Sequence, residues 1–443
     1  MFAENAQSDK SYKNSKLFTN KKLPKILFSL FLACGGLIAT YLTLSFGVSI
    51  TSAASNDFDN FPTGSSAPQT LFTVTNNNDS GAGSLRQAII DAQDGDTITF
   101  APNVSGTIEL TSGELSITEN LTLTGPGSTI MSVSGNNASR VFFIDGAIVV
   151  ISGLTIRDGN TVACGGGICA SAANLTLSDT VVISNAGGLG GGISNYGTLT
   201  LINSSIVENS SIDTGGGINN LGELYVSNSV ISGNLTLTAG GGINNSCASA
   251  NSVILDTTIA NNHSAQHAGG MGICTGTTAV ITNTTFSGNT SDTGGGGLDV
   301  YGTVTIFNST IVNNSAVDGG GIRNLSGSTM LKNSIVANNT SGGDCAGTVQ
   351  SNGRNLSSSN TCDFTNAGDI QNIDPQIGPL TDNGGRTPTH LLLAGSPAIN
   401  AGDNVDCPTF DQRGVGRPQA GICDIGAVEL ALPNSLYLPL VFK

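Results

Sequence analysis

The chain has 443 residues, a formal net charge of −15 and 60 glycines. A charge this negative excludes a general electrostatic affinity for nucleic acid or anionic lipid. The length exceeds that of an ordinary single domain, and the 38% hydrophobic fraction argues against disorder, so one long repeat array is the architecture to consider.

Residues 1–54 are expected to direct export. The basic stretch "KKLPK" precedes an apolar run of about 25 residues, and the small residues "TSAAS" follow it as a cleavage site. A run of this length also spans a bilayer, so an uncleaved membrane anchor is the alternative. We therefore expect a protein that is secreted or held on the outer side of the cell surface, with residues 55–70 as a linker.

Residues 71–100 are interpreted as an N-terminal cap. The stretch "GSLRQAIIDAQDGDTITF" offers Ser84 as the N-cap of a short helix. The apolar face of this helix would consist of Leu85, Ala88, Ile89 and Ala92. A solenoid leaves its ends open to other chains, so a helix that covers the first turn is expected here.

Residues 101–343 carry two motifs that return with one period. The first is a glycine-rich stretch before an apolar residue, at Ile168, Ile193, Ile218, Ile243, Ile273, Leu298 and Ile322, with steps of 25, 25, 25, 30, 25 and 24 residues. The second is a nine-residue unit, such as "LINSSIVEN", that ends in Asn185, Asn209, Asn234, Asn262, Asn289, Asn314 or Asn339. A shared period of this size indicates a solenoid. The 30-residue step indicates a loop of five extra residues between His263 and Gly270.

Each repeat contains about three short apolar stretches, which is typical of strands. The sequence therefore predicts an all-β parallel β-helix of about ten rungs, each of roughly 25 residues and stacked ~4.8 Å apart. Glycine suits turns that stack on one another, because these leave little room for side chains and φ can be positive. The predicted turn glycines are Gly165, Gly166, Gly167, Gly190, Gly191, Gly192, Gly215, Gly216, Gly217, Gly240, Gly241, Gly242, Gly319, Gly320 and Gly321. Columns of Asn and Asp are expected to form hydrogen-bonded ladders along the stack.

Residues 344–430 differ from the repeats and are expected to form a small disulfide-bonded C-terminal cap, followed by an apolar tail at residues 431–443. Removal of the leader leaves eight cysteines, an even number that favours disulfides in an exported chain. The candidate pairs are Cys345 with Cys362, Cys407 with Cys423, Cys164 with Cys169, and Cys247 with Cys274. Reduced, buried thiols are the alternative. The charged residues Asp411, Arg413, Arg417, Asp424 and Glu429 are expected to pair with one another in this cap.

Several of these stretches resemble bacterial surface proteins. "FTVTNNNDSGAGSLRQAI" resembles the opening of proteins named for a Cys-Ser-Leu-Arg-Glu-Ala motif, with Gly83 and Gln87 in place of the Cys and the Glu. "GGGI" paired with "FSGN" or "IVEN" resembles the repeats of polymorphic outer-membrane proteins. "DPQIGPLTDNGGRTPTHLLLAGSPAINAG", with "DQRGVGRPQAGICDIGAVE", resembles a choice-of-anchor Q domain. These resemblances imply an exported, surface-associated, right-handed β-helix that is attached through its C-terminus by a route that stays open.

Parallel β-helices include polysaccharide lyases and hydrolases, which use acids to hold Ca²⁺ or to transfer protons beside a basic residue. The best such group is expected on two adjacent rungs, where Asp299 and Arg323 follow the inward residue and point outward. Asp292 and Asp318 precede the glycines of the same rungs. These residues could hold Ca²⁺ and an acidic glycan. The alternative is a surface ion pair beside two solvated acids.

His263 and His267 are expected in the solvated loop that the 30-residue step indicates. Their spacing is that of a zinc site only on a helix, so we assign no zinc site and interpret the loop as a candidate contact for a partner.

The sequence thus favours a non-catalytic, adhesin-like surface protein that acts as a monomer and contacts an unidentified extracellular glycan or protein. A carbohydrate-active β-helix and a structural spacer of the envelope are the alternatives. No catalytic residue is assigned, and no cofactor is expected apart from Ca²⁺ at the acidic group. Membrane contact is expected only through the N-terminal segment or the C-terminal attachment, and nucleic acid is not an expected partner.

Overall fold

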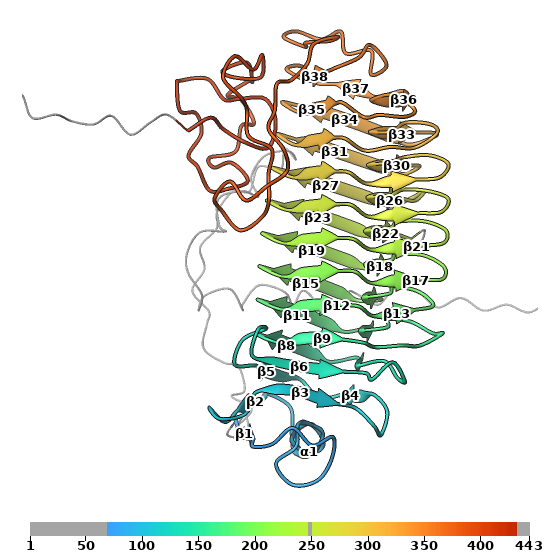
Figure 1. Cartoon of the computed structure of the whole chain (residues 1–443), viewed down its shortest axis with the longest axis vertical. Coiled ribbons are helices and arrows are strands. Elements are labelled where there is room, and N and C mark those ends of the chain that lie inside the picture. Colours follow the sequence, from blue (N-terminus) through green and yellow to red (C-terminus); the bar gives the residue numbers. More distant parts are fainter. Residues whose placement is uncertain (1–68, 247–249, 432–443) are drawn as a thin grey trace, which may run out of the picture. The chain divides into compact units, whose positions relative to one another are not determined.

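The computed structural model describes residues 69–246 and 250–431, and most of these wind into a parallel β-helix (Figure 1). The predictions for the export segment, for most of the linker and for nearly all of the tail lie outside these residues. In the described part of the chain, no helix has the length and apolar character needed to cross a membrane. The prediction of an all-β parallel β-helix with a short N-terminal helix is confirmed.

Three long sheets form the faces of the β-helix, and a short fourth sheet links sheet B to sheet C. Sheet A contains β1 (Leu71–Val74), β2 (Asp96–Phe100), β5 (Leu121–Thr124), β8 (Ile148–Ser152), β11 (Asn174–Ser178), β15 (Thr198–Ile202), β19 (Glu223–Ser227), β23 (Asn251–Leu255), β27 (Thr278–Thr282), β31 (Thr303–Phe307), β34 (Ser328–Lys332) and β37 (Gln350–Ser351). Sheet B contains β3 (Gly106–Glu109), β6 (Met131–Ser134), β9 (Thr155–Arg157), β12 (Val181–Ile183), β16 (Ser205–Val207), β20 (Val230–Ser232), β24 (Thr258–Ala260), β28 (Thr285–Ser287), β32 (Thr310–Val312), β35 (Ile335–Ala337) and β38 (Leu356–Ser357). Sheet C contains β4 (Leu115–Ile117), β7 (Phe142–Asp145), β10 (Ile168–Ser171), β14 (Ile193–Asn195), β18 (Ile218–Asn220), β22 (Ile243–Asn245), β26 (Met271–Ile273), β30 (Leu298–Val300), β33 (Ile322–Asn324) and β36 (Cys345–Gly347). Sheet D contains β13 (Ala186–Gly187), β17 (Ser210–Ser211), β21 (Leu235–Thr236), β25 (His263–Ser264) and β29 (Thr290–Ser291).

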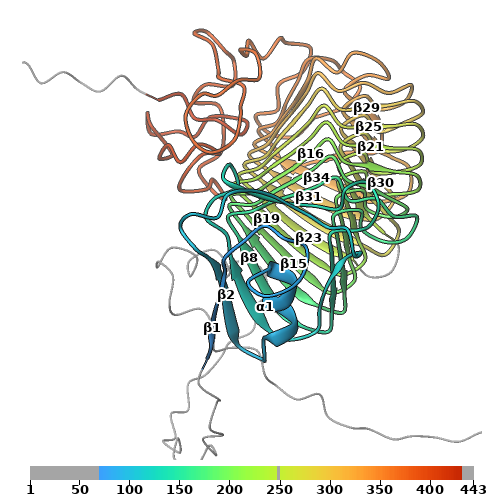
Figure 2. The ribbon, with the colours of Figure 1, turned by 60° about the horizontal axis from the view of Figure 1, so that its bottom comes forward.

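The core lies inside the stacked coils and follows directly from alternation along each strand. In β15, Leu199 and Leu201 are fully buried, whereas the residues between and beside them face outward. The same alternation recurs on neighbouring strands in register, so that one continuous apolar cluster extends from Val74 to Phe364. Figure 2 shows the coils stacked in this way, with α1 (Leu85–Asp91) lying against the first of them.

The glycine motif forms the turn before each sheet C strand. Gly215 has a φ of 66°, which L side chains rarely adopt. A β-carbon on the next residue, Gly216, would lie 2.5 Å from the carbonyl oxygens of Gly241 and Leu235. Backbone of the adjacent rung therefore fills the space that a side chain would need.

The asparagines that end the nine-residue unit form a buried ladder. The Nδ2 atom of Asn234 donates to Oδ1 of Asn262 at 2.9 Å, and Asn262 donates to Asn289 at the same distance. The ladder runs through Asn185, Asn209, Asn234, Asn262, Asn289, Asn314 and Asn339, all of which are buried. It satisfies backbone groups inside the turn that would otherwise lack partners.

A second column of Asn and Asp turns the chain from sheet A to sheet B. We call it the corner column: Asp179, Asn203, Asn228, Asp256, Asn283, Asn308 and Asn333. Its φ angles lie between 43° and 52°, a left-handed conformation that Asn and Asp tolerate better than other side chains. A Ser or Thr follows each member, and five of these hydroxyls accept from the backbone of the preceding rung, as when Ser204 N donates to Ser229 Oγ at 3.1 Å.

The predicted five-residue loop between His263 and Gly270 is wrong. Strand pairing aligns Ile243 with Met271, not with Ile273, and Met271 with Leu298. The extra residues instead fall in two connections from sheet C to sheet A, one between β22 and β23 and the other between β26 and β27. The segment around His263 keeps its place in sheet D, where it pairs with Leu235.

The N-terminal end is covered as the sequence predicts. Ser84 accepts a hydrogen bond from the backbone of Gln87 at 3.1 Å, and the apolar face of α1 is buried. Arg86 forms an ion pair with Asp79 at 2.7 Å and also donates to the carbonyl oxygen of Glu114, which ties the helix to the next coil.

The residues after the repeats form a last coil and then a C-terminal segment that lies outside the coils. Strands β36 to β38 add a last coil, which the Cys345–Cys362 disulfide and the buried Phe364 close. The C-terminal segment, residues 375–431, then returns beside sheet B (Figure 1). Gln412 illustrates the contact, because its side chain accepts from Thr285 Oγ1 at 2.6 Å.

The C-terminal segment is held together by charge and by a disulfide. Asp411 pairs with Arg413 at 2.7 Å, and Arg417 with Glu429 at 3.4 Å. Glu429 also accepts from the backbone of Asp424 at 2.9 Å. These five charged residues therefore lie together, as expected from the sequence.

Disulfides join Cys164 with Cys169, Cys345 with Cys362, and Cys407 with Cys423. Cys274 is also disulfide-bonded, and its predicted partner, Cys247, lies outside the described residues.

Candidate functional site

Asp299 and Arg323 are neighbours in sheet C and form a shielded ion pair. They lie in register on β30 and β33, with Arg323 Nε 2.8 Å from Asp299 Oδ1 and Nη2 2.5 Å from Oδ2. The hydrogen bond to Asp299 raises the pKa of Arg323. Both side chains point away from the apolar core, but only 1% of Asp299 and 7% of Arg323 is exposed. A β-carbon on Gly294 would lie 2.2 Å from the guanidinium carbon, so the turn at this glycine covers the pair.

Among the described residues, neither of the other two acids of the predicted group forms an ion pair with Arg323, although the charge of Asp318 contributes to the raised pKa of Arg323. Asp318 is exposed, and the side chain of Asp292 is 63% exposed and lies 3.9 Å from His263. No group of three or more His, Cys, Asp or Glu side chains within the described ranges could hold a metal ion. The acids of the predicted group therefore do not converge on one point in the described residues, and binding of Ca²⁺ or a glycan at these four residues stays a prediction.

His267 joins the shielded pair instead of standing in a free loop. Its Nδ1 atom lies 2.9 Å from Arg323 Nη2 and 3.7 Å from Asp299 Oδ2. His263 lies on β25, and its Nδ1 atom is 2.9 Å from Thr290 Oγ1 on the next rung. Both imidazoles are partly exposed, so they border the surface beside β25 while taking part in contacts between rungs.

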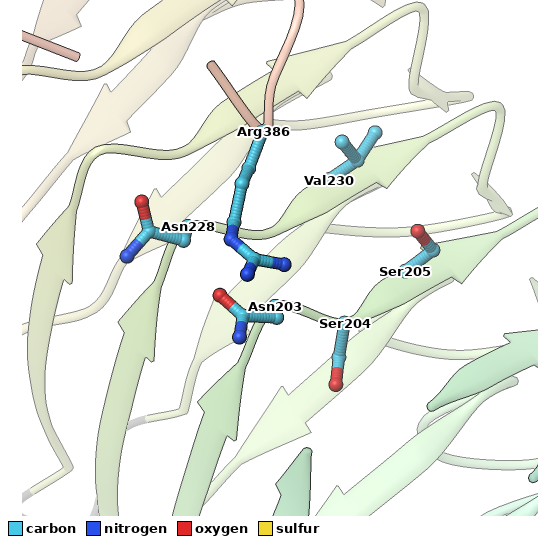
Figure 3. A pocket seen from close by; sticks show the side chains of 6 residues that line it. All are labelled: Asn203, Ser204, Ser205, Asn228, Val230 and Arg386. Atoms are coloured by element: carbon cyan, nitrogen blue, oxygen red, sulfur yellow. The ribbon is translucent and has the colours of Figure 1, made fainter. Parts of the chain in front are cut away.

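A pocket of about 220 Å³ lies where the C-terminal segment passes the corner column (Figure 3). Its lining residues are Asn203, Ser204, Ser205, Asn228, Val230 and Arg386. Figure 3 shows the Arg386 guanidinium reaching down between the side chains of Asn203 and Asn228. No pattern in the sequence predicts this pocket. The corner column repeats with the period of the coils, but its meeting with Arg386 depends on the return of the C-terminal segment.

The outer face of sheet A is long and poor in charge. Each strand from β8 to β34 turns three side chains outward, and only Glu223 and Lys332 among them are charged. The central column reads Val150, Thr176, Thr200, Tyr225, Val253, Val280, Thr305 and Met330. Tyr225 and Val280 are 43% and 40% exposed. A row of hydroxyl and apolar groups thus repeats at the rung spacing of ~4.8 Å.

Comparison with known proteins shows the fold and nothing finer. No protein-family model matches the chain, and no curated protein matches it. The solved structure of pectate lyase Pel9A matches with a TM-score of 0.51 and 16% identity, over 82% of this chain and 97% of that chain. The PL6 family alginate lyase AlyGC matches at 14% identity with a TM-score of 0.36, over 82% of this chain and 59% of that chain. At 16% identity, the match to pectate lyase Pel9A establishes a shared parallel β-helix only.

Proposed function

We propose that this chain is an exported, non-catalytic β-helix protein of the cell surface that contacts a neutral glycan along the outer face of sheet A. The resemblance to choice-of-anchor Q proteins and the N-terminal apolar run support export and surface attachment. The observation that carries the glycan contact is the charge-poor column of hydroxyl and apolar side chains on sheet A.

The chemistry of this face suits an uncharged, extended partner. Binding a neutral chain requires no desolvation of ionic groups at the central column, and Tyr225 offers an exposed ring with a polar tip. A glycan that runs along the axis would meet equivalent positions at every rung, so weak contacts would accumulate over many coils. The negative charge of the whole chain also favours a neutral glycan over an acidic one.

A polysaccharide lyase is the second candidate, and the fold of pectate lyase Pel9A supports it. Such an enzyme needs a base that can reach its substrate. Arg323 directs its donors at Asp299 and His267 under a covering turn, so the predicted residues offer weaker support for this candidate than sheet A offers for glycan contact.

The test is retention of the full chain on insoluble cellulose, xylan and chitin. The variant Val280→Asp places an unpaired carboxylate under the bound glycan and should weaken retention about tenfold or more, because its desolvation costs over 1 kcal/mol. Val162→Asp is the matched control, since Val162 is 89% exposed in a turn outside sheet A, and it should be retained like the parent protein. Equal retention of the two variants, or a parent protein that no neutral glycan retains, would refute the proposal.

A further inference from the structure

The corner column already binds peptide backbone within this chain. Asn333 Nδ2 donates to the carbonyl oxygen of Asp403 at 2.9 Å, and the backbone N–H of Asp403 donates to Asn333 Oδ1 at 2.8 Å. Asn283 Nδ2 donates to the carbonyl oxygen of Phe410 at 2.8 Å. A side-chain amide offers one donor and one acceptor side by side, which is the pattern that a backbone amide requires. Two members of the column therefore hold the C-terminal segment by its main chain.

The next free members of the column lie in the Arg386 pocket. The side chains of Asn203 and Asn228 make no hydrogen bond to the described residues, and neither does that of Ser205. All three are partly exposed and border the same cavity (Figure 3). They share the left-handed backbone of Asn283 and Asn333, so their amides leave the corner in the same way.

Arg386 adds a positive charge that is only weakly paired and can bind a further carboxylate. Its ion partner is Asp179 at 3.9 Å, and both side chains are more than 60% exposed, at 61% and 62%. A pair at this distance in water holds its partners weakly. A guanidinium has five donors in a planar fork, which suits a carboxylate held at two oxygens.

We infer that this pocket binds an extended peptide of a partner protein, with Asn203 and Asn228 taking its backbone amides and Arg386 taking an acidic side chain. The inference goes beyond the proposed function, because it concerns a protein partner and a surface apart from sheet A. A peptide is favoured over a sugar because the same column pairs with main-chain N–H and C=O groups at Asn333.

The probe is a fluorescein-labelled peptide that copies residues 402–412 with Cys407→Ser, since this stretch supplies the backbone bound at Asn333 and contains three aspartates. Fluorescence polarisation with the full chain measures its binding. In the parent protein, the chain's own Asp403 and Phe410 already occupy Asn333 and Asn283. The added peptide therefore has only the free members of the column to occupy. A second peptide with all three aspartates changed to asparagine keeps the backbone and removes the carboxylates.

The variants separate the two kinds of contact. Asn203→Gly with Asn228→Gly removes both amides and keeps the left-handed turns, because glycine adopts positive φ freely. Arg386→Gln removes the charge. Each change should weaken binding of the aspartate peptide about tenfold. Arg157→Gln is the control, because Arg157 is a half-exposed arginine on β9 that does not line the pocket, and it should leave binding unchanged.

The asparagine peptide should bind the parent protein as weakly as the aspartate peptide binds Arg386→Gln. Val280→Asp should leave peptide binding intact, so that failure of the glycan proposal and failure of this one are distinguishable. The inference is overturned if the aspartate peptide does not bind saturably, or if Arg386→Gln and Arg157→Gln bind it equally. It is also overturned if calorimetry shows that sodium galacturonate binds the pocket while the peptide does not.

Discussion

Removing one side chain of the asparagine ladder should destabilise the protein more than any surface substitution in the same coil. Asn262 makes four side-chain hydrogen bonds: it donates to Ile231 O and to Asn289 Oδ1, and it accepts from N and Nδ2 of Asn234, all at 2.9 to 3.0 Å. At ~1 kcal/mol for each buried bond, Asn262→Ala should lower the free energy of unfolding by about 4 kcal/mol. The value lies toward the upper part of the range usual for single substitutions, because the buried N–H of Asn234 would be left without its acceptor.

Denaturant unfolding followed by circular dichroism measures the loss, and hydrogen exchange of the Asn234 amide locates it. Asn174→Ala is the control, because Asn174 is exposed on sheet A and its change should stay within about 0.5 kcal/mol. A loss below about 1 kcal/mol for Asn262→Ala, with unchanged exchange at Asn234, would show that the ladder does not stabilise the coils as argued.

Three further predictions concern the turns, the shielded pair and pH. Gly216→Val should abolish or broaden cooperative unfolding in a thermal melt, since its β-carbon would lie 2.5 Å from two carbonyl oxygens; an unchanged melt would contradict stacked turns. Arg323→Ala should destabilise the chain by about 3–5 kcal/mol in denaturant unfolding, because Asp299 would remain buried without its partner. Asp299→Leu combined with Arg323→Met should cost far less, and equal losses would refute this reasoning. Burial raises the pKa of Asp256 to about 6, so its protonated form is favoured in the folded chain. Its contribution to stability is therefore full below pH ~4 and lost as the pH rises through about 6, and Asp256→Asn should remove that part of the pH dependence.

Much of the fold could be predicted because each rung repeats the same order of apolar strands and polar or glycine turns. Three apolar strands, a glycine turn and a polar corner recur in one phase, and stacking is the arrangement that buries all of the apolar faces together. The register at Met271 could not be predicted in the same way. Both Met271 and Ile273 follow glycines and are apolar, so the pattern fits either residue. The choice depends on which turns are longer, and turns tolerate extra residues at little energetic cost.

The candidate sites were harder to predict because they depend on packing outside the core. Alternation correctly directs Asp299 and Arg323 away from the apolar interior, but it does not show that the preceding turn folds over them. The meeting of Arg386 with the corner column depends on the return of the C-terminal segment along sheet B. No local pattern encodes a contact between residues so far apart in the sequence.

The most direct test of the proposed function measures binding and cleavage in one experiment. The full chain is incubated with cellulose, xylan, chitin, polygalacturonate and alginate, with and without Ca²⁺. Retained protein, new reducing ends and unsaturated products are then measured. The account predicts retention on a neutral glycan without any product, whether or not Ca²⁺ is present. Release of unsaturated products from polygalacturonate or alginate, above all if it depends on Ca²⁺, would contradict it and establish a lyase.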